Sequence, residues 1–334
     1  MKTHRVAIVL FFLALAPGLP ARPTQRSWFV ECSAGFALLA PADLNARLEA
    51  QQARADFLYR DNYDAQQRLS GGAFTYALEE PAGSGLQGLG NGFPLSLRLG
   101  RALGRRAAVF VGLQFLDRSR SSFLQRTYRV SDLRPDQVTP PGAFVVETGF
   151  PEYLLAARAW IPQLGLRLDL LRRRPWTAGM RLAIGPMFAS LRTLESQYYR
   201  RTDADGYWSE WRQVVDMKGR GTAVALEAAA RLELEVVPRL SLFAEGGYAL
   251  RRGSRFSGPG SFAYQYRDVH AAQNPQRLRW EDAEWRVRRL EISRDWGSLT
   301  YVLSGNDLAG YADTGRFRLD LSGWGLAAGL SWAL

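Results

Sequence analysis

The chain has 334 residues, 47% of them hydrophobic, and its 43 Lys and Arg against 32 Asp and Glu give a formal net charge of +11. A single cysteine, Cys32, excludes an intrachain disulfide. Beyond the N-terminal segment no stretch approaches about 18 consecutive apolar residues, which argues against a protein that spans a membrane with helices.

The N-terminus is typical of a secretory signal peptide. Lys2 and Arg5 precede an apolar run at residues 6–16 that is too short to span a bilayer, and the segment Pro-Gly-Leu-Pro-Ala follows it. We expect cleavage after Ala21, so that residues 1–21 are removed and residues 22–334 form one mature domain. The alternative is a retained anchor helix.

Most of the mature chain alternates large apolar residues with small or polar ones at the period of two that is typical of β-strands. The expected strands cover residues 28–39, 92–100, 107–115, 145–161, 176–191, 224–236, 240–250 and 316–334. Short connections, such as residues 102–106 and 237–239, alternate with long ones. We interpret residues 162–175 as a further connection on the side of the short turns, although it is longer than usual.

This pattern predicts an all-β fold, namely a closed antiparallel up-and-down transmembrane β-barrel with eight strands and long extracellular loops. Closure is required because an open sheet edge in hydrocarbon would leave backbone groups unpaired. On the strand at residues 145–161 we expect the apolar phase from Tyr153 to Ile161 to face lipid and Arg158 to face the lumen.

The first long loop, residues 41–72, contains an expected amphipathic helix. Asp43 is a candidate N-cap, and five residues, four of them apolar, then recur at helical spacing. They are Leu44, Leu48, Gln51, Ala55 and Leu58. The helix is either a lid packed on the barrel rim, which we favour, or a plug that enters the lumen.

The last long stretch, residues 252–315, also contains strand-like segments at residues 285–292 and 299–303. They either extend the sheet beyond the membrane or add a hairpin that gives ten strands. In the strand that follows, the apolar phase changes from odd to even numbers near Gly323, which predicts a β-bulge there.

The final strand ends at the C-terminus with apolar residues on one face and small residues on the other. Gly329, Trp332 and Leu334 match a Gly followed by two residues and then hydrophobic–any–hydrophobic, which resembles the C-terminal assembly signal of bacterial outer-membrane β-barrels. At the level of strand pattern, nearly the whole mature chain is similar to small outer-membrane barrels of the OmpX and OmpW type.

The resemblance implies a location in the cell outer membrane and contact with outer-membrane lipid, lipopolysaccharide and the barrel-assembly machinery. The positive charge suits phosphate-rich lipopolysaccharide, since Arg pairs bidentately with phosphate. Nucleic acid is not an expected partner of an exported barrel, and the oligomeric state stays open.

Charged residues occupy the phase that is expected to face the lumen. They are Glu31, Arg98, Arg158, Arg181, Glu227, Arg231, Glu233, Glu235, Glu245, Arg251, Arg318 and Asp320. An eight-stranded barrel has an interior that side chains can fill, and an unpaired buried charge is costly. We therefore expect a network of ion pairs; the alternative is a narrow polar pathway.

Aromatic and basic residues also cluster in an expected external hairpin. They are Tyr198, Tyr199, Arg200, Arg201, Trp208 and Trp211. They could bind glycans or a host surface, and the two arginines could meet lipopolysaccharide phosphate. We favour the simpler interpretation, in which the aromatic rings pack an extension of the sheet.

The sequence offers no recognisable catalytic, cofactor or metal site. His270 is the one histidine of the mature chain and has no evident Ser-His-acid partners. The Asp203-x-Asp205-Gly206 segment is more typical of a hairpin turn than of a calcium loop. We expect a non-enzymatic protein with a role in envelope integrity or surface interaction; the alternative is a small porin or a conduit for small or apolar solutes.

Overall fold

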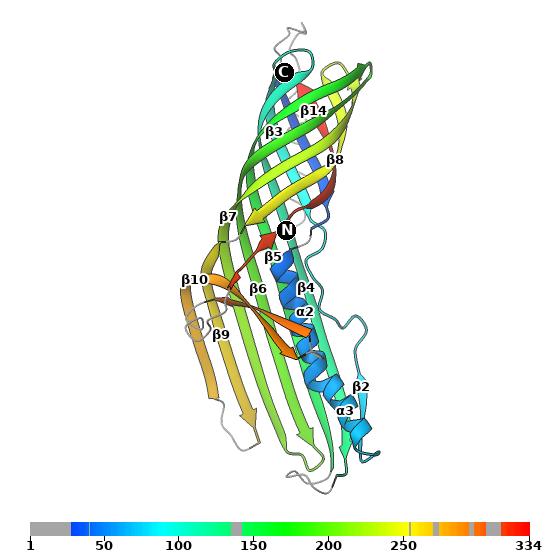
Figure 1. The fold of residues 1–334 in the computed structure, drawn as a ribbon, viewed down its shortest axis with the longest axis vertical. Helices are drawn as coiled ribbons and strands as arrows, with labels where there is room; N and C mark the ends of the chain where they lie inside the picture. Colours follow the sequence, from blue (N-terminus) through cyan, green and yellow to red (C-terminus); the bar gives the residue numbers. More distant parts are fainter. Residues whose placement is uncertain are drawn as a thin grey trace.

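The computed structural model describes residues 28–39, 41–134, 142–253, 255–269, 274–293, 297–304 and 315–334. The expected signal peptide and His270 lie outside these residues. The fold is an all-β antiparallel sheet with one helical segment (Figure 1). Within the described part of the chain, no helix has the length and apolar character needed to cross a membrane.

Eight strands close into a ring. They are β1 (Trp28–Ala37), β3 (Phe93–Ala102), β4 (Ala107–Asp132), β5 (Gly142–Arg173), β6 (Trp176–Asp203), β7 (Trp208–Val237), β8 (Leu240–Gly253) and β14 (Gly323–Ala333). Neighbours in this order pair antiparallel, and β14 pairs with both β8 and β1, so that the ring has no free edge.

Strands β4 to β7 are far longer than the ring requires. They have 26, 32, 28 and 30 residues, whereas a membrane-crossing strand needs about 9–11. Beyond the ring they continue into an open sheet, which we call the distal sheet. It also contains β2 (Phe74–Glu79), β9 (Phe256–Asp268), β10 (Asn274–Ser293) and β11 (Gly297–Ser304). Strand β9 takes the place of β8 beside β7.

The strand count is therefore larger than expected. Within the described residues the sheet has fourteen strands, two of which, β12 (Gly315–Arg316) and β13 (Leu319–Asp320), have only two residues each. The ring itself has eight. The ten-strand alternative is wrong, because β10 and β11 extend the distal sheet instead of entering the ring.

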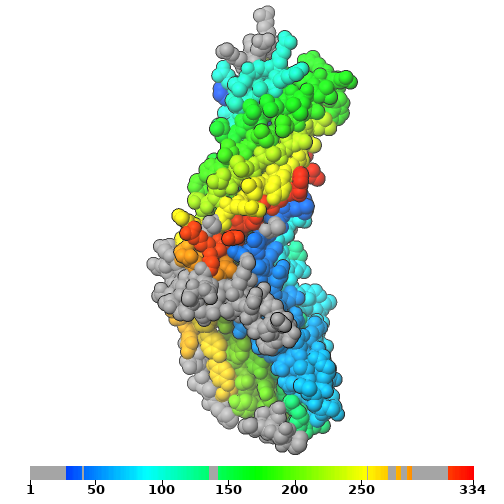
Figure 2. Space-filling model, viewed as in Figure 1, coloured from blue at the N-terminus to red at the C-terminus, as the bar shows by residue number. Residues whose placement is uncertain are grey.

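The helical segment follows β1 and lies along the distal sheet rather than inside the ring (Figures 1 and 2). It consists of α2 (Ala42–Ala55), the π-helical turn η1 (Asp56–Asp61) and α3 (Asn62–Leu69). The plug interpretation is therefore wrong. Asp43 is not the N-cap, a position that Pro41 occupies; its carboxylate instead accepts a hydrogen bond from the backbone N–H of Arg318 at 2.6 Å.

One apolar core joins the helix to the strands. Leu44 and Leu48 of α2 are buried in the same cluster as Tyr153, Leu155 and residues of β6 and β7. This cluster explains why the expected facing of β5 is wrong. The apolar phase from Tyr153 to Ile161 is fully buried, and Arg158 faces outward. Beside the helix the interior is apolar, so apolar residues point inward.

The connection expected at residues 162–175 is also wrong, because β5 continues to Arg173 and only Arg174 and Pro175 link it to β6. Pro162 interrupts the sequence pattern and lies opposite Pro186 in a gap of the β5–β6 ladder, which resumes in the same register at Leu164 and Ile184. Proline cannot donate a ladder hydrogen bond. Two facing prolines leave this gap without ending either strand.

No bulge occurs near Gly323. Leu319 pairs with Gly253, Gly323 with Ala249 and Trp332 with Leu240, which is one continuous register against β8. Odd-numbered residues face inward throughout. Phe317, Leu319 and Leu321 are buried, as part of the core above the lumen. The apolar residues change from odd to even numbers because the interior is an apolar core up to Leu321, whereas from Gly323 onward the inward-facing residues line the lumen and the apolar ones face outward.

Candidate functional site

The outside of the ring is apolar. Large hydrophobic side chains are exposed there on all eight strands, among them Phe36, Leu95, Val111, Trp160, Leu182, Leu226, Leu242 and Leu326. They alternate with inward residues because successive side chains of a strand point to opposite faces. The outer surface of the ring is thus apolar, and charged side chains lie in its interior.

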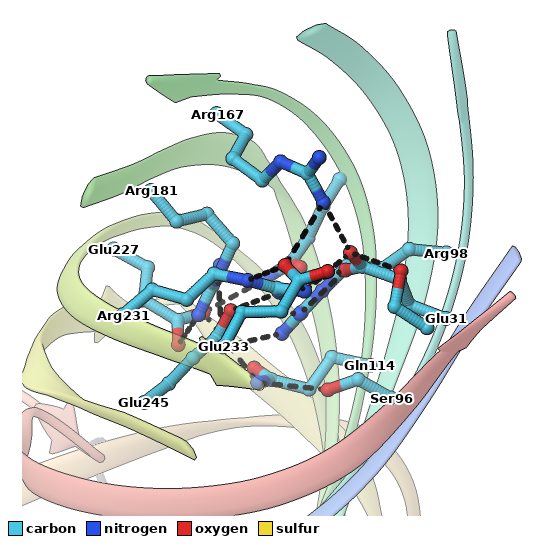
Figure 3. A network of polar contacts seen from close by, with 12 residues as sticks. Glu31, Ser96, Arg98, Gln114, Arg167, Arg181, Glu227, Arg231, Glu233 and Glu245 are labelled. Atoms are coloured by element: carbon cyan, nitrogen blue, oxygen red, sulfur yellow. Dashed lines mark hydrogen bonds and ion pairs between the residues drawn. The ribbon is translucent and has the colours of Figure 1, made fainter. Parts of the chain in front are cut away.

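The interior holds a network of eight charged side chains (Figure 3). The cations are Arg98 of β3, Arg167 of β5, Arg181 of β6 and Arg231 of β7, and the carboxylates are Glu31 of β1, Glu227 and Glu233 of β7, and Glu245 of β8. Among these eight the positive and negative groups are equal in number, and the buried Asp169 adds a further contact to Arg167 at 3.4 Å. The pairing spans six strands, so the network links opposite sides of the ring.

Glu31 and Glu245 are the two centres of the network. Glu31 contacts Arg98 at 3.4 Å, Arg167 at 3.0 Å and Arg231 at 2.8 Å. Glu245 accepts hydrogen bonds from Arg98 at 3.2 Å, Arg181 at 3.0 Å and Arg231 at 3.0 Å. Each carboxylate therefore faces three guanidinium groups, which offsets much of the cost of burying it.

Further contacts complete the network at its edges. Arg181 donates to Glu227 at 2.7 Å, and Arg231 donates to Glu233 at 2.9 Å. The Arg231 guanidinium also lies 3.7 Å from the ring centroid of Phe243. The aromatic face supplies a cation–π contact to this buried guanidinium.

Little free space lies beside the network. A cavity beside Gln114, Arg181, Glu245 and Arg251 has a volume of about 30 Å³, which is room for only a few water molecules. No group of His, Cys, Asp and Glu in the described part of the chain could hold a metal ion. The arrangement is suited to holding opposite strands together across a packed interior.

The structure brings together only part of the expected lumen set. Arg158 pairs with Asp117 on the outside at 3.2 Å, and Asp320 pairs with the exposed Arg252 at 2.8 Å. Arg318 is exposed beyond the ring. Glu235 contacts the exposed Arg174 at 3.8 Å.

Two further residues differ from the expectation. Arg251 is buried in the lumen and donates to Gln114 at 3.0 Å instead of to a carboxylate. Arg167 was missed, because it lies in the stretch after Pro162 that the sequence suggested was a connection. The alternation Leu164, Leu166, Leu168 with Arg167 and Asp169 was the signal that could have found it.

The aromatic and basic cluster divides between the two faces of the distal sheet. Tyr199 and Trp211 share the face with the helices, where their rings stack at 5.9 Å; Tyr199 also stacks on Tyr59 at 6.1 Å and Trp211 on Tyr264 at 6.4 Å. Burial raises the pKa of Tyr59 to about 12. Rings that cover one another in this way favour a packing role.

The remaining members of that cluster make separate contacts. Arg201 lies over Phe144 at 4.1 Å on the face with the helices. Tyr198, Arg200 and Trp208 lie on the opposite face, with Arg200 over Trp208 at 5.6 Å. The six residues therefore do not form one surface.

The C-terminal residues lie where the ring closes. Gly329 pairs with Ser33 of β1 and with Phe243 of β8. The backbone N–H of Leu334 donates to the carbonyl oxygen of Trp28 at 2.8 Å, and Trp332 pairs with Val30. These residues hold together the first and last strands.

No protein-family model and no curated protein sequence matches the chain. Among solved structures it is similar to a major outer membrane protein from Thermus thermophilus, with 12% identity, a TM-score of 0.27 and coverage of 93% of this chain and 100% of the other. It is also similar to the outer membrane protease OmpT from Escherichia coli, with 10% identity, a TM-score of 0.30 and coverage of 95% and 99%.

These TM-scores are too low to assign a function by similarity. The geometry of the chain itself is more informative. An antiparallel ring with no free edge, apolar outside and ion-paired inside, fits an outer-membrane β-barrel.

Proposed function

We propose that the protein is a non-enzymatic outer-membrane β-barrel that anchors the distal sheet and its helices outside the cell, with a role in envelope integrity or surface interaction. The observation that carries the proposal is the reversal of polarity across the ring wall. Leu95, Leu97 and Leu99 are exposed while Ser96 and Arg98 between them are buried. A water-soluble sheet has the opposite arrangement.

The orientation follows from the two ends of the ring. One end has tight connections, such as Arg174-Pro175 and Pro238-Arg239, and also holds Trp28 and Leu334 near the chain ends. The distal sheet lies at the other end. Short turns belong to the periplasmic side of outer-membrane barrels and long excursions to the outside, so the distal sheet is extracellular.

The alternative is transport of small or apolar solutes through the ring. The paired charges and the cavity of about 30 Å³ support a sealed interior. A conduit would need Glu31 or Glu245 to release several arginines at once, which would leave buried charges uncompensated.

The test is single-channel recording of refolded protein in a planar lipid bilayer. We expect no steady conductance, in a sample whose mobility on a gel shifts with boiling as a folded barrel's does. Arg98→Ala, which removes a network side chain, serves as the comparison. Discrete conductance steps in the unmodified protein, changed in Arg98→Ala, would establish a pore instead.

A further inference from the structure

We propose that the extracellular rim of the barrel carries a binding site for the phosphate groups of an outer-leaflet lipid. The site lies on the face of the sheet opposite the helices, where the apolar surface ends. Trp160 and Phe188 pair across β5 and β6 and are exposed there. Aromatic side chains of this kind mark the headgroup level of a membrane.

The next outward-facing residues along the strands are basic or small. Arg158 pairs with Ser190, which pairs with Arg220 of β7, which in turn pairs with Ser257 of β9. The row lies just beyond the point where β9 replaces β8 beside β7. It crosses four strands at one level, about 7 Å above the aromatic pair at two residues per step.

These residues line a groove of about 710 Å³. Its cations are Arg158, Arg192, Lys218 and Arg220, its floor includes Ala156, Ser190 and Ser257, and none of its lining residues is acidic. Short side chains between long basic ones give an anion room to approach several cations together.

Two of the four cations are uncompensated. Arg158 contacts Asp117 at 3.2 Å and Arg192 contacts Asp216 at 3.0 Å. In the described part of the chain Lys218 and Arg220 make no ion pair, although both are exposed and lie in the groove. Phosphate suits this set, because Arg binds its oxygens in a fork and Lys adds a compact charge.

The source of the phosphate is indicated by a second groove below the first. It has a volume of about 640 Å³ and an almost wholly apolar lining that includes Leu164, Ile184 and Leu226. These residues lie on β5, β6 and β7, each six positions along its strand from Arg158, Ser190 and Arg220 respectively. Six residues span about 20 Å.

A charged groove at the headgroup level with an apolar groove beneath it on the same three strands matches one amphiphilic molecule. Its phosphates lie between Lys218 and Arg220, and an acyl chain follows the strands past Leu226. The inference rests on the proposed outer-membrane location and adds the chemical class of a bound lipid.

The experiment is binding of bisphosphorylated lipid A to the refolded full-length protein in detergent, measured by native mass spectrometry beside dephosphorylated lipid A and inorganic phosphate. We expect lipid A to bind in preference to both. The variant Lys218→Gln/Arg220→Gln should weaken that binding about tenfold or more, because charged hydrogen bonds are lost. The control Arg105→Gln/Arg106→Gln removes two exposed charges from the opposite end of the ring and should bind as the unmodified protein does.

Equal binding of dephosphorylated lipid A would overturn the inference, as would an equal loss in the control variant. Displacement of the lipid by a low concentration of inorganic phosphate would show a free-phosphate site and overturn the lipid assignment. Each sample is first inserted into lipid vesicles and checked for heat-shifted gel mobility. A protein that does not insert contradicts the barrel proposal, whereas one that inserts without phosphate preference contradicts only the lipid site.

Discussion

Arg47 of helix α2 and Glu195 of strand β6 form a buried ion pair between the helix and the distal sheet. Arg47 Nη2 donates to Glu195 Oε2 at 2.8 Å, and Gln51, one turn further along the helix, donates to the same oxygen at 3.3 Å. Side-chain exposures of 6% and 5% show that water does not reach the pair. The two carboxylate oxygens and the guanidinium thus fix the position of the helix on an otherwise apolar core.

Replacing Glu195 by Gln should release the helix without opening the ring. Removal of one partner from a buried ion pair costs about 3–5 kcal/mol, and Arg47 and Glu195 are both buried. We expect limited proteolysis to cut residues 42–69 in Glu195→Gln while the heat-shifted gel mobility persists. Glu79→Gln, which breaks the exposed pair with Arg129, is the control and should leave proteolysis unchanged. Equal protection in both variants would show that the ion pair does not hold the helix.

Replacing Glu245 by Gln should weaken the ring itself. Arg98, Arg181 and Arg231 all donate to this carboxylate, so its loss leaves three buried cations with fewer partners. We expect the free energy of unfolding, measured with urea in lipid vesicles, to fall by about 3–5 kcal/mol. Glu235→Gln, whose partner Arg174 is almost fully exposed, should change it little. A similar result for both variants would contradict the role given to the network.

Alkaline pH should loosen the contact between the helical segment and the distal sheet. Burial raises the pKa of Tyr59 and of Tyr128 to about 12, whereas tyrosine in an unfolded chain ionises near about 10. Between these values the unfolded state holds fewer protons than the folded one, so stability is complete below pH 10 and falls as the pH rises toward 12. Ultraviolet absorbance of tyrosinate, followed beside proteolysis of the helical segment, measures the change.

The variant Tyr128→Phe provides the matched control for the alkaline prediction. The Tyr128 hydroxyl is buried and has no hydrogen-bond partner in the described part of the chain. Its removal should leave stability at neutral pH nearly unchanged and reduce the loss above pH 10. If Tyr128→Phe loosened as steeply as the unmodified protein, ionisation of this residue would not contribute.

Replacing Gly329 by Ala should impair closure of the ring. A Cβ at this position would lie 2.2 Å from the carbonyl oxygen of Cys32 and 2.6 Å from the Phe243 ring, so backbone on the neighbouring strand must move. We expect a smaller fraction of refolded protein with heat-shifted mobility. In Gly246→Ala the added atom meets only the flexible end of Leu326 at 3.1 Å, and folding should proceed. Normal yield for Gly329→Ala would contradict the prediction.

The eight-stranded ring was predictable because lipid imposes one rule on every crossing strand. Where a strand contacts hydrocarbon, large apolar residues such as Leu97, Leu182 and Leu226 must alternate with inward ones, and these facings agree with the structure. Glu31, Arg98, Arg181, Arg231 and Glu245 were placed in the lumen on this basis. The cost of a buried unpaired charge predicted that these residues pair with one another. It did not predict which residue pairs with which.

The distal sheet could not be derived in the same way, because the rule changes where the strands leave the membrane. Apolar residues such as Leu155 and Phe317 then face inward against a helix, and Arg158 faces out, although the period of two continues. The alternation records which residues share a face and not which face is buried. Pro162 caused a second error, because a proline in the sequence suggested that the strand ends there. Only its position opposite Pro186 in the sheet shows that the strand continues past it.

The length of the central strands has a mechanical consequence. Strand β5 runs for 32 residues from the far end of the distal sheet to the tight turn at the other end of the ring, which is about 100 Å at the usual rise. The four long strands pair side by side over most of their length, so the ring and the distal sheet are parts of one continuous sheet. A force applied at the free end of the distal sheet is therefore transmitted along these strands into the wall of the ring.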